Sequence, residues 1–385
     1  MFLKLMGALP GSIYATSRDG IYVNLFVGSE AAIEQDNLDV SVRQTTLYPW
    51  DGIVRLTITP KKATSFAMNL RVPEWCRGAE YRLNGSLVEP QTVQGYARFE
   101  RVWHPDDTLE FVMPFPVQRV KADHRIAADI GRVALMRGPI VYCLEGLDNG
   151  GHVGSLVLTN SGTILAEHRP DLLGGMTVLR GNAQIVRERS TPTYPLGKQT
   201  VSQGSFTAIP FYGNTNRRST EMVVWIADEI ENARALTLAG SAVPTASHCN
   251  ATDFVWALND AKEPRASDDD TVSRFTWWDH RGTEEWVQYE FPIESDVSGV
   301  EVYWWDERRV QRECRVPQSW SVQYLIGDEW SPVIAATAYG TDMDKYNRVL
   351  FDAVKTKALR IAVQLQAGWS GGILQWRVLE PDIVG

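Results

Sequence analysis

Short stretches in which apolar and polar residues alternate follow one another along most of this 385-residue chain. Alternation with a period of two is typical of a strand that buries one face, and turn residues between such stretches favour antiparallel neighbours. Asn84-Gly85 is a hairpin-type turn signal of this kind. The pattern predicts antiparallel β-sandwiches. Its clearest stretches are residues 21–27, 52–60, 65–73 and 108–115.

The composition changes near residue 245. Ten of the 14 tryptophans lie in residues 246–385. This segment holds 23 acidic and 14 basic residues, whereas residues 1–245 hold 24 of each, so the segment carries the whole net charge of −9. Nucleic-acid binding needs a basic face, and the charge therefore excludes that class. Strand-like stretches at jelly-roll spacing cover residues 254–260, 284–291, 297–305, 319–330, 358–366 and 372–380.

These patterns predict an all-β protein with a short N-terminal helix. The expected parts are a helix segment (residues 1–12), a first β-sandwich (13–116), a second β-sandwich (117–230), an Ala-rich linker (231–245) and a β jelly roll (246–385). No apolar run approaches the roughly 20 residues of a membrane helix, so no membrane partner is expected. The apolar core of the opening segment is too short for a convincing signal peptide, and the localisation stays open.

Three stretches carry a resemblance to a known family. They are LYPWDG (Leu47–Gly52), LRVPEWC (Leu70–Cys76) and RVALMRGPIVYCLEGLDN (Arg132–Asn149), and the segment Thr207–Asp228 agrees with them. Together they resemble the β-sandwich region of glycoside hydrolase family 127, typified by β-L-arabinofuranosidases, in which the sandwiches follow an α-helical catalytic barrel. Residues 246–385 resemble the discoidin-type, galactose-binding-like fold (coagulation factor 5/8 C-terminal), which hosts many ligands.

The resemblance implies a reaction for complete family members. A cysteine thiolate held by zinc attacks the sugar, and a glutamate serves as acid/base in a retaining hydrolysis. The nucleophile of the family stands in a Cys-Cys-Pro turn before the last barrel helix, and residues 1–12 are interpreted as a remnant of that helix. No residue of this chain matches the nucleophile, the zinc ligands or the acid/base. Zinc is therefore expected only in the barrel, which is the expected partner in cis or as a separate chain.

Two pairs of acidic residues are further candidates for catalysis. Asp106 and Asp107 stand in HPDDTLEF, where a solvated turn before a strand is the favoured interpretation. Glu145 and Asp148 flank Gly146-Leu147, where hydrogen bonding at the end of a loop is favoured. The chain alone is expected to be inactive, although the question whether it is an enzyme stays open.

The four cysteines, Cys76, Cys143, Cys249 and Cys314, form no CxxC motif. Zinc-ribbon and redox motifs are thereby excluded. A disulfide between Cys249 and Cys314 is an alternative that the spacing leaves open.

Sugar recognition needs flat aromatic faces and a few directed polar groups. Three loops of the expected jelly roll offer them, at residues 275–282, 304–314 and 366–372. The alternative is that these tryptophans pack the core. The candidate carbohydrate-binding residues are Trp278, His280, Arg308 and Trp369.

A structural calcium is the other candidate ligand. The resemblance implies a calcium loop after the first strands and a glutamate near the C-terminal strand, but that position reads Gln375. The alternatives are a calcium site and a solvated acidic turn. The hard oxygen ligands available in the loop are Asn259, Asp260, Asp268, Asp269 and Asp270.

Two functions are compatible with these observations. The first is the non-catalytic C-terminal portion of a family-127-like glycosidase, in which the sandwiches support the barrel and the jelly roll is an accessory carbohydrate-binding module. It predicts an exposed apolar face on the first sandwich. The second is a free-standing carbohydrate-binding or adhesion protein without hydrolase activity, which predicts no such face.

Overall fold

The computed structural model describes residues 2–18, 20–35, 38–160, 162–193, 198–217, 220–310 and 312–382. Strands dominate, and one short helix, α1 (Phe2–Ala8), stands at the N-terminus. The predicted all-β fold is confirmed. The chain forms two compact units. The first comprises residues 1–120, 134–142 and 210–212, and the second comprises residues 121–133, 143–209 and 213–385.

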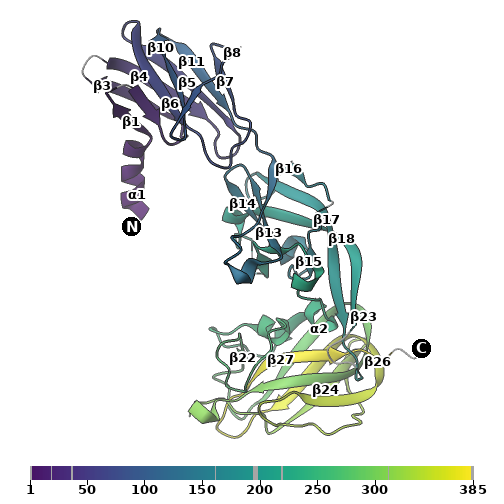
Figure 1. Cartoon of the computed structure of the whole chain (residues 1–385). Helices are drawn as coiled ribbons and strands as arrows, with labels where there is room; N and C mark the ends of the chain where they lie inside the picture. The colour runs from purple at the N-terminus through teal and green to yellow at the C-terminus, as the bar shows by residue number, and fades with distance from the viewer. Residues whose placement is uncertain are drawn as a thin grey trace. The chain divides into compact units, whose positions relative to one another are not determined.

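The first unit contains two sheets, seen at the purple and blue end of the chain in Figure 1. One sheet has the order β1 (Tyr14–Ser17), β2 (Gly20–Val23), β6 (Thr64–Arg71), β10 (Tyr96–Trp103) and β9 (Gln91–Val93). The other has the order β3 (Ser29–Gln35), β4 (Leu38–Thr46), β5 (Ile53–Pro60), β11 (Asp107–Val112), β7 (Glu80–Leu83) and β8 (Ser86–Leu87). Strands β2 and β6 pair in parallel, because the chain visits the second sheet between them.

Side chains of both sheets meet in one apolar core. The residues of β11 alternate between buried and half-buried positions, as the period of two predicts. Trp103 is fully buried, and its indole Nε1 donates a hydrogen bond to the carbonyl of Phe66 at 3.0 Å. The rings of Tyr81 and Phe111 stack with centroids 4.9 Å apart. Aromatic side chains therefore supply much of the buried surface of this unit.

A hairpin follows the first sandwich. Strand β12 (Val117–Val120) pairs with β13 (Arg132–Arg137), which turns into β14 (Ile140–Glu145). Gly138 in the turn has φ +57°, and a Cβ atom there would lie 2.7 Å from the ring of Phe115. Only glycine fits this position, so the Arg-Gly-Pro corner sets the direction of the chain.

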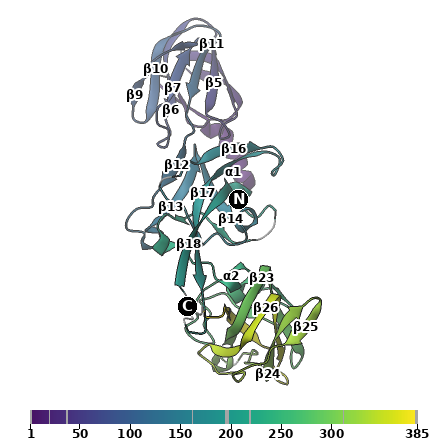
Figure 2. The ribbon, with the colours of Figure 1, turned by 90° about the vertical axis from the view of Figure 1, so that its right-hand side faces the viewer.

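The second unit begins with a further β region. Strands β20 (Ile226–Ala227), β15 (Leu156–Val157), β17 (Met176–Arg189) and β18 (Lys198–Pro210) lie side by side in that order. Figure 2 shows β17 and β18 as a long antiparallel pair, and β16 (Leu165–Arg169) pairs with the start of β17.

The segment expected to be a linker, residues 231–245, contains regular structure. Leu236 donates its backbone N–H to the carbonyl of Val186 at 2.8 Å and accepts from the N–H of Glu188 at 3.0 Å. Helix α2 (Leu238–Ser241) follows, and β21 (Val243–Ala246) pairs with the next domain. Residues 231–245 are mostly small and show no alternation of apolar and polar positions. The helix and the strand in this segment were therefore not predicted.

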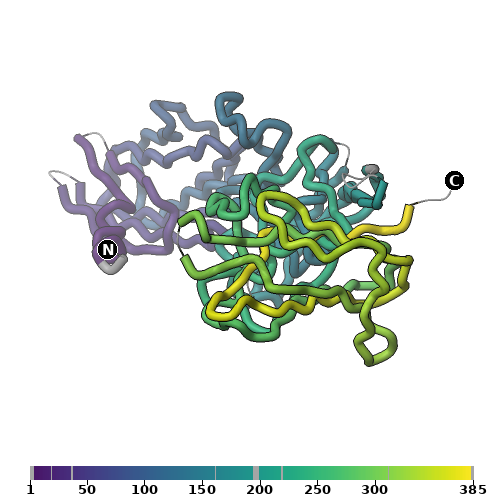
Figure 3. Tube along the Cα trace, turned by 90° about the horizontal axis from the view of Figure 1, so that it is seen from below, coloured from purple at the N-terminus to yellow at the C-terminus, as the bar shows by residue number. Residues whose placement is uncertain are grey.

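The C-terminal β domain, residues 246–382, is built on two long strands. Figure 3 follows its path in green to yellow. Strand β23 (Glu284–Trp305) pairs with β26 (Asn347–Gln364), and its register shifts between Glu290 and Ser295. The rings of Tyr289 and Trp376 stack in the core, 3.8 Å apart. The sheet has the order β22 (Phe275–Thr276), β27 (Gly372–Leu379), β23, β26, β24 (Ser319–Ile326) and β25 (Glu329–Pro332).

All four cysteines are free thiols, and Cys76, Cys143 and Cys314 are buried. The structure therefore contains no disulfide between Cys249 and Cys314. Burial raises the pKa of the Cys143 thiol to about 12. In the part of the chain that the structure describes, no helix is long and apolar enough to span a membrane.

Replacement of Trp103 by alanine should destabilise the first unit by about 3–5 kcal/mol, because it leaves a large cavity and removes the indole hydrogen bond to the Phe66 carbonyl. Hydrogen–deuterium exchange of residues 20–115 in the full chain would measure the loss. Trp50→Ala is the matched control, since Trp50 is 53% exposed and should change stability by about 0.5 kcal/mol at most. Equal effects of the two substitutions would contradict this assignment of the core.

His152 should make the second unit less stable in acid. Burial, followed by the charge of Arg234, lowers its pKa from 6.5 to about 4. The folded state therefore resists protonation, and its stability should be complete above pH 6.5 and fall as the pH drops towards 4. Urea unfolding at several pH values would measure this. His152→Gln should remove that part of the pH dependence, and an unchanged slope would contradict the prediction.

Candidate functional site

Glu145 and Asp148 lie at the end of β14, where one arginine holds both of them. Glu145 is fully buried, and the Arg217 guanidinium donates to it at 2.6 Å and to Asp148 at 2.8 and 2.5 Å. The backbone N–H of Thr215 donates to the second oxygen of Glu145 at 2.8 Å. Both carboxylates are thus used in fixing the loop, in agreement with the favoured interpretation of the sequence.

Asp106 and Asp107 form the turn before β11. Asp107 accepts hydrogen bonds from the backbone N–H of His104 at 2.9 Å and from the side chain of Asn84 at 2.8 Å. Asp106 has a positive φ of 69°, and its carboxylate accepts from Thr59 at 3.0 Å. The pair closes a turn, as the sequence favours.

A surface pocket of about 350 Å³ lies in the C-terminal β domain. Such a volume is at the lower end of the range for small-molecule sites, ~300–1,000 Å³. Three chain segments far apart in the sequence form it. Its lining residues are Asn250, Asp253, Arg274, Thr276, Trp278, Trp305, Glu307, Arg312, Glu313 and Cys314.

Backbone hydrogen bonds bring these segments together. The N–H of Asn250 donates to the carbonyl of Thr276 at 3.1 Å, which ties the turn at residues 250–253 to β22. The loop after β23 closes on itself, because Glu307 donates its N–H to the carbonyl of Cys314 at 3.0 Å. Backbone hydrogen bonds therefore hold the segments that line the pocket in their relative positions.

Trp278 is the exposed aromatic side chain of the pocket, with 39% of its surface accessible. Its indole Nε1 donates to Glu313 at 2.8 Å, and Arg281 pairs with the same carboxylate. The Trp278 hydrogen bond, with help from the charge of Arg281, holds the pKa of Glu313 below its usual value. The indole ring is thus oriented by a partner that stays ionised at neutral pH.

Two arginines that line the pocket, Arg274 and Arg312, each lie close to a carboxylate of the lining. Trp305 is buried, and the Arg274 guanidinium lies 4.9 Å from its ring centroid. Arg274 also lies 3.5 Å from Asp253, whose other oxygen accepts from Thr276 at 2.5 Å. On the other side Arg312 lies 3.8 Å from Glu307. The lining therefore contains two pairs, each of one guanidinium and one carboxylate group.

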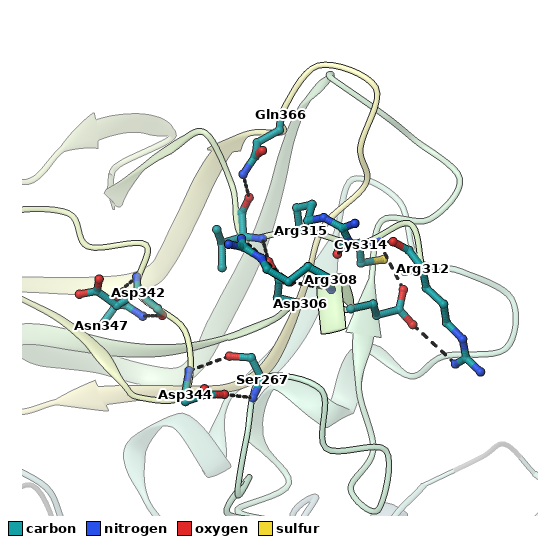
Figure 4. Close-up of polar contacts among 12 residues, drawn as sticks. Ser267, Asp306, Arg308, Arg312, Cys314, Arg315, Asp342, Asp344, Asn347 and Gln366 are labelled. Carbon is teal, nitrogen blue, oxygen red and sulfur yellow. Dashed lines mark hydrogen bonds and ion pairs between the residues drawn. The ribbon is translucent and has the colours of Figure 1, made fainter. Parts of the chain in front are cut away.

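Arg308, a predicted sugar ligand, holds the loop instead. Figure 4 shows it against Asp306, to which it donates from Nε at 3.0 Å and from a terminal nitrogen at 2.7 Å. Asp306 is fully buried and also accepts from the N–H of Val316 at 3.0 Å. A second link in Figure 4 joins Ser267 and Asp344 by reciprocal hydrogen bonds of 2.8 and 2.9 Å.

His280 and Trp369 also lie outside the lining of the pocket. His280 stacks on His248 with centroids 4.0 Å apart, and its Nδ1 lies 2.6 Å from Glu285. The Arg315 guanidinium covers one face of Trp369 at 4.0 Å. Of the four predicted residues, only Trp278 lines the pocket.

The predicted calcium ligands serve separate local contacts. The Asn259 amide donates to the carbonyls of Ala239 and Ala242 at 2.8 and 3.1 Å. Asp260 accepts from the N–H of Lys262, Asp268 lies 3.4 Å from Arg309, and Asp269 accepts from Arg265 and Thr271. Asp270 is exposed. Among the described residues, no three His, Cys, Asp or Glu side chains are placed to hold a metal ion. As arranged, the five residues do not form a calcium cage, and the calcium site stays a prediction.

Sequence reasoning missed most of the pocket. Glu307, Arg312 and Glu313 lie in a loop that it singled out, but it had no sign by which to choose them among the charged residues of that loop. Asn250, Asp253 and Arg274 come from segments that long-range contacts bring to the pocket, namely the Asn250–Thr276 backbone hydrogen bond and the pairing of β22 with β27.

Comparison with known proteins finds family matches for residues 20–115 and 117–227. Residues 20–115 match the family model "Beta-L-arabinofuranosidase, GH127 middle domain", and residues 117–227 match "Glycoside hydrolase family 127 C-terminal domain". The non-reducing end β-L-arabinofuranosidase of Bifidobacterium longum is 30% identical over 240 residues, which cover 58% of this chain and 35% of the relative.

Two solved structures agree with this match. The GH127 β-L-arabinofuranosidase Ara127N-Se of Geobacillus stearothermophilus T6 has 40% identity and a TM-score of 0.55, over 59% of this chain and 36% of its own. The GH127 β-arabinofuranosidase BT3674 has 31% identity and a TM-score of 0.54, over 60% and 38%. The chain thus spans little more than a third of these relatives. Residues 20–227 thus match two adjacent domains of glycoside hydrolase family 127, and in this part the chain is a family-127-like protein.

Proposed function

We propose that this chain is the non-catalytic C-terminal portion of a β-L-arabinofuranosidase-like glycosidase. Its two family-127 domains support an α-helical catalytic barrel, in cis or as a separate chain, and its discoidin-like C-terminal β domain is an accessory carbohydrate-binding module. The matches to the middle and C-terminal domains support the assignment to this part of the enzyme. Arg217 forms ion pairs with both Glu145 and Asp148, which supports a structural role for these two carboxylates.

One observation carries the proposal, an exposed apolar surface on the first unit. The Trp50 patch consists of Leu47, Trp50 and Tyr212, which are 67%, 53% and 50% exposed. The rings of Trp50 and Tyr212 lie 5.1 Å apart, and the N–H of Trp50 donates to the carbonyl of Leu47 at 2.8 Å. Large apolar side chains that cluster at a surface mark a protein–protein contact. A free-standing adhesion protein gives no reason for this patch.

The chain alone should not hydrolyse p-nitrophenyl β-L-arabinofuranoside, with or without added zinc, because the proposed nucleophile and acid/base lie in the barrel. Release of p-nitrophenol measures this, and the Geobacillus relative serves as the positive control. Turnover by the chain that Glu145→Gln abolishes would overturn the proposal and make Glu145 a catalytic residue.

The Trp50 patch should bind the catalytic barrel. Calorimetric titration of the full chain with the barrel region of the Geobacillus relative should give a complex, and Trp50→Asp should weaken it by about tenfold or more. Phe254→Asp is the matched control, because Phe254 is as exposed but lies in the C-terminal β domain. Equal affinity of the Trp50→Asp chain and the unchanged chain would refute docking through this patch, and so would the absence of any complex.

A further inference from the structure

We infer that the pocket of the C-terminal β domain binds a neutral sugar ring, with Trp278 as its stacking face and the Arg274–Asp253 and Arg312–Glu307 pairs as its hydroxyl partners. The inference rests on the proposed accessory role of this domain. It moves the binding site away from His280, Arg308 and Trp369, and it names the chemical class of the ligand.

The stacking face comes from Trp278. An aromatic ring supplies a sugar with a flat apolar surface only if the ring is exposed and held in place. Trp278 meets both conditions, because it is 39% exposed and its Nε1 is bonded to Glu313. Trp369 is as exposed, at 38%, but the Arg315 guanidinium lies over its ring at 4.0 Å. Trp277 and Trp305 are buried.

The hydroxyl partners follow from the free capacity of the lining groups. A sugar hydroxyl both donates and accepts, so it fits between a carboxylate and a guanidinium. Arg274 approaches Asp253 through Nε, and Arg312 approaches Glu307 through one terminal nitrogen. Asp253 also accepts from Thr276, and Glu307 also accepts from the N–H of Cys314 at 3.2 Å, so each of these largely buried carboxylates keeps only part of its accepting capacity. Each guanidinium has further N–H groups, so a sugar hydroxyl can find a donor and an acceptor at each pair.

Charge selects a neutral ligand. The lining holds two arginines, Arg274 and Arg312, against three carboxylates, those of Asp253, Glu307 and Glu313. Arg281 pairs with Glu313, so each of these carboxylates lies beside a guanidinium group. A ligand carboxylate or phosphate would therefore have to compete with a protein carboxylate for its guanidinium partner. An ammonium group would have to compete with Arg274, Arg281 and Arg312 for carboxylates that they already neutralise. A polyol satisfies the polar groups without disturbing these pairs.

The size of the pocket points to the end of a sugar chain. Its volume of about 350 Å³ suits a small ligand, and two of its lining residues, Trp305 and Cys314, are buried. A long internal stretch of polysaccharide would need an open groove lined by several exposed rings. Trp278 is the one exposed aromatic residue of this lining.

The test is a calorimetric titration of the full chain with galactose, glucose, L-arabinose and short oligosaccharides ending in each. At least one neutral sugar should bind. The matching uronic acid and amino sugar should bind with an affinity at least about tenfold lower. Trp278→Ala should weaken binding by about tenfold. Glu313→Ala, a change at an exposed side chain, should weaken it several-fold because it releases the indole.

The matched control is Trp369→Ala, which removes an equally exposed tryptophan from a neighbouring loop and should leave the affinity unchanged. Thermal unfolding of each variant separates loss of binding from loss of folding. The inference is overturned if no neutral sugar binds, if the uronic acid binds best, or if Trp369→Ala and not Trp278→Ala abolishes binding. Binding that depends on Trp369 and not on Trp278 would refute the pocket and leave the accessory role of the domain intact. Absence of all sugar binding would refute both the pocket and the accessory role, and would leave the hydrolysis and barrel-docking tests unaffected.

Discussion

The pocket of the C-terminal β domain depends on one buried carboxylate, that of Asp306. A fully buried charge is tolerated only when its hydrogen-bonding capacity is met, and Asp306 receives two N–H groups of the loop and two from the Arg308 side chain. Its own N–H donates to the carbonyl of Ser267 at 2.9 Å. These bonds fix the corner after β23, from which Glu307, Arg312 and Glu313 reach the pocket. Arg308 is thus a positioning residue for the site.

Much of the fold was predictable from local pattern. Alternating residues gave the strands of the first sandwich, and Gly138-Pro139 gave a corner where only glycine fits. The neighbouring residues Trp304 and Trp305 depart from the alternation, because a strand with one buried face would bury only one of two successive rings. Both rings are buried, because the register of β23 against β27 shifts between Tyr303 and Trp304, and Cys314, Val272 and Tyr346 cover the second face. Residues distant in the sequence cover the outer face of this strand, so its burial cannot be predicted from the pattern within the strand.

The candidate site was predictable only in part. A tryptophan in a loop is visible in the sequence, and Trp278 was named for that reason, but its exposure is known only from the structure. The sequence did not show that Arg308 would be committed to Asp306, nor that Arg315 would cover Trp369. Asp253 and Arg274 come to the pocket through strand pairing, which is a long-range property. Tertiary contacts therefore decide which of several similar polar residues line the pocket.

The four free thiols have a consequence for where this protein can be made. Burial raises the pKa of every one of them, most clearly at Cys143 and Cys314, so little reactive thiolate exists at neutral pH. Folding needs no oxidant, and a reducing agent has no bond to break. A reducing host is therefore compatible with the folded structure, since no disulfide has to form.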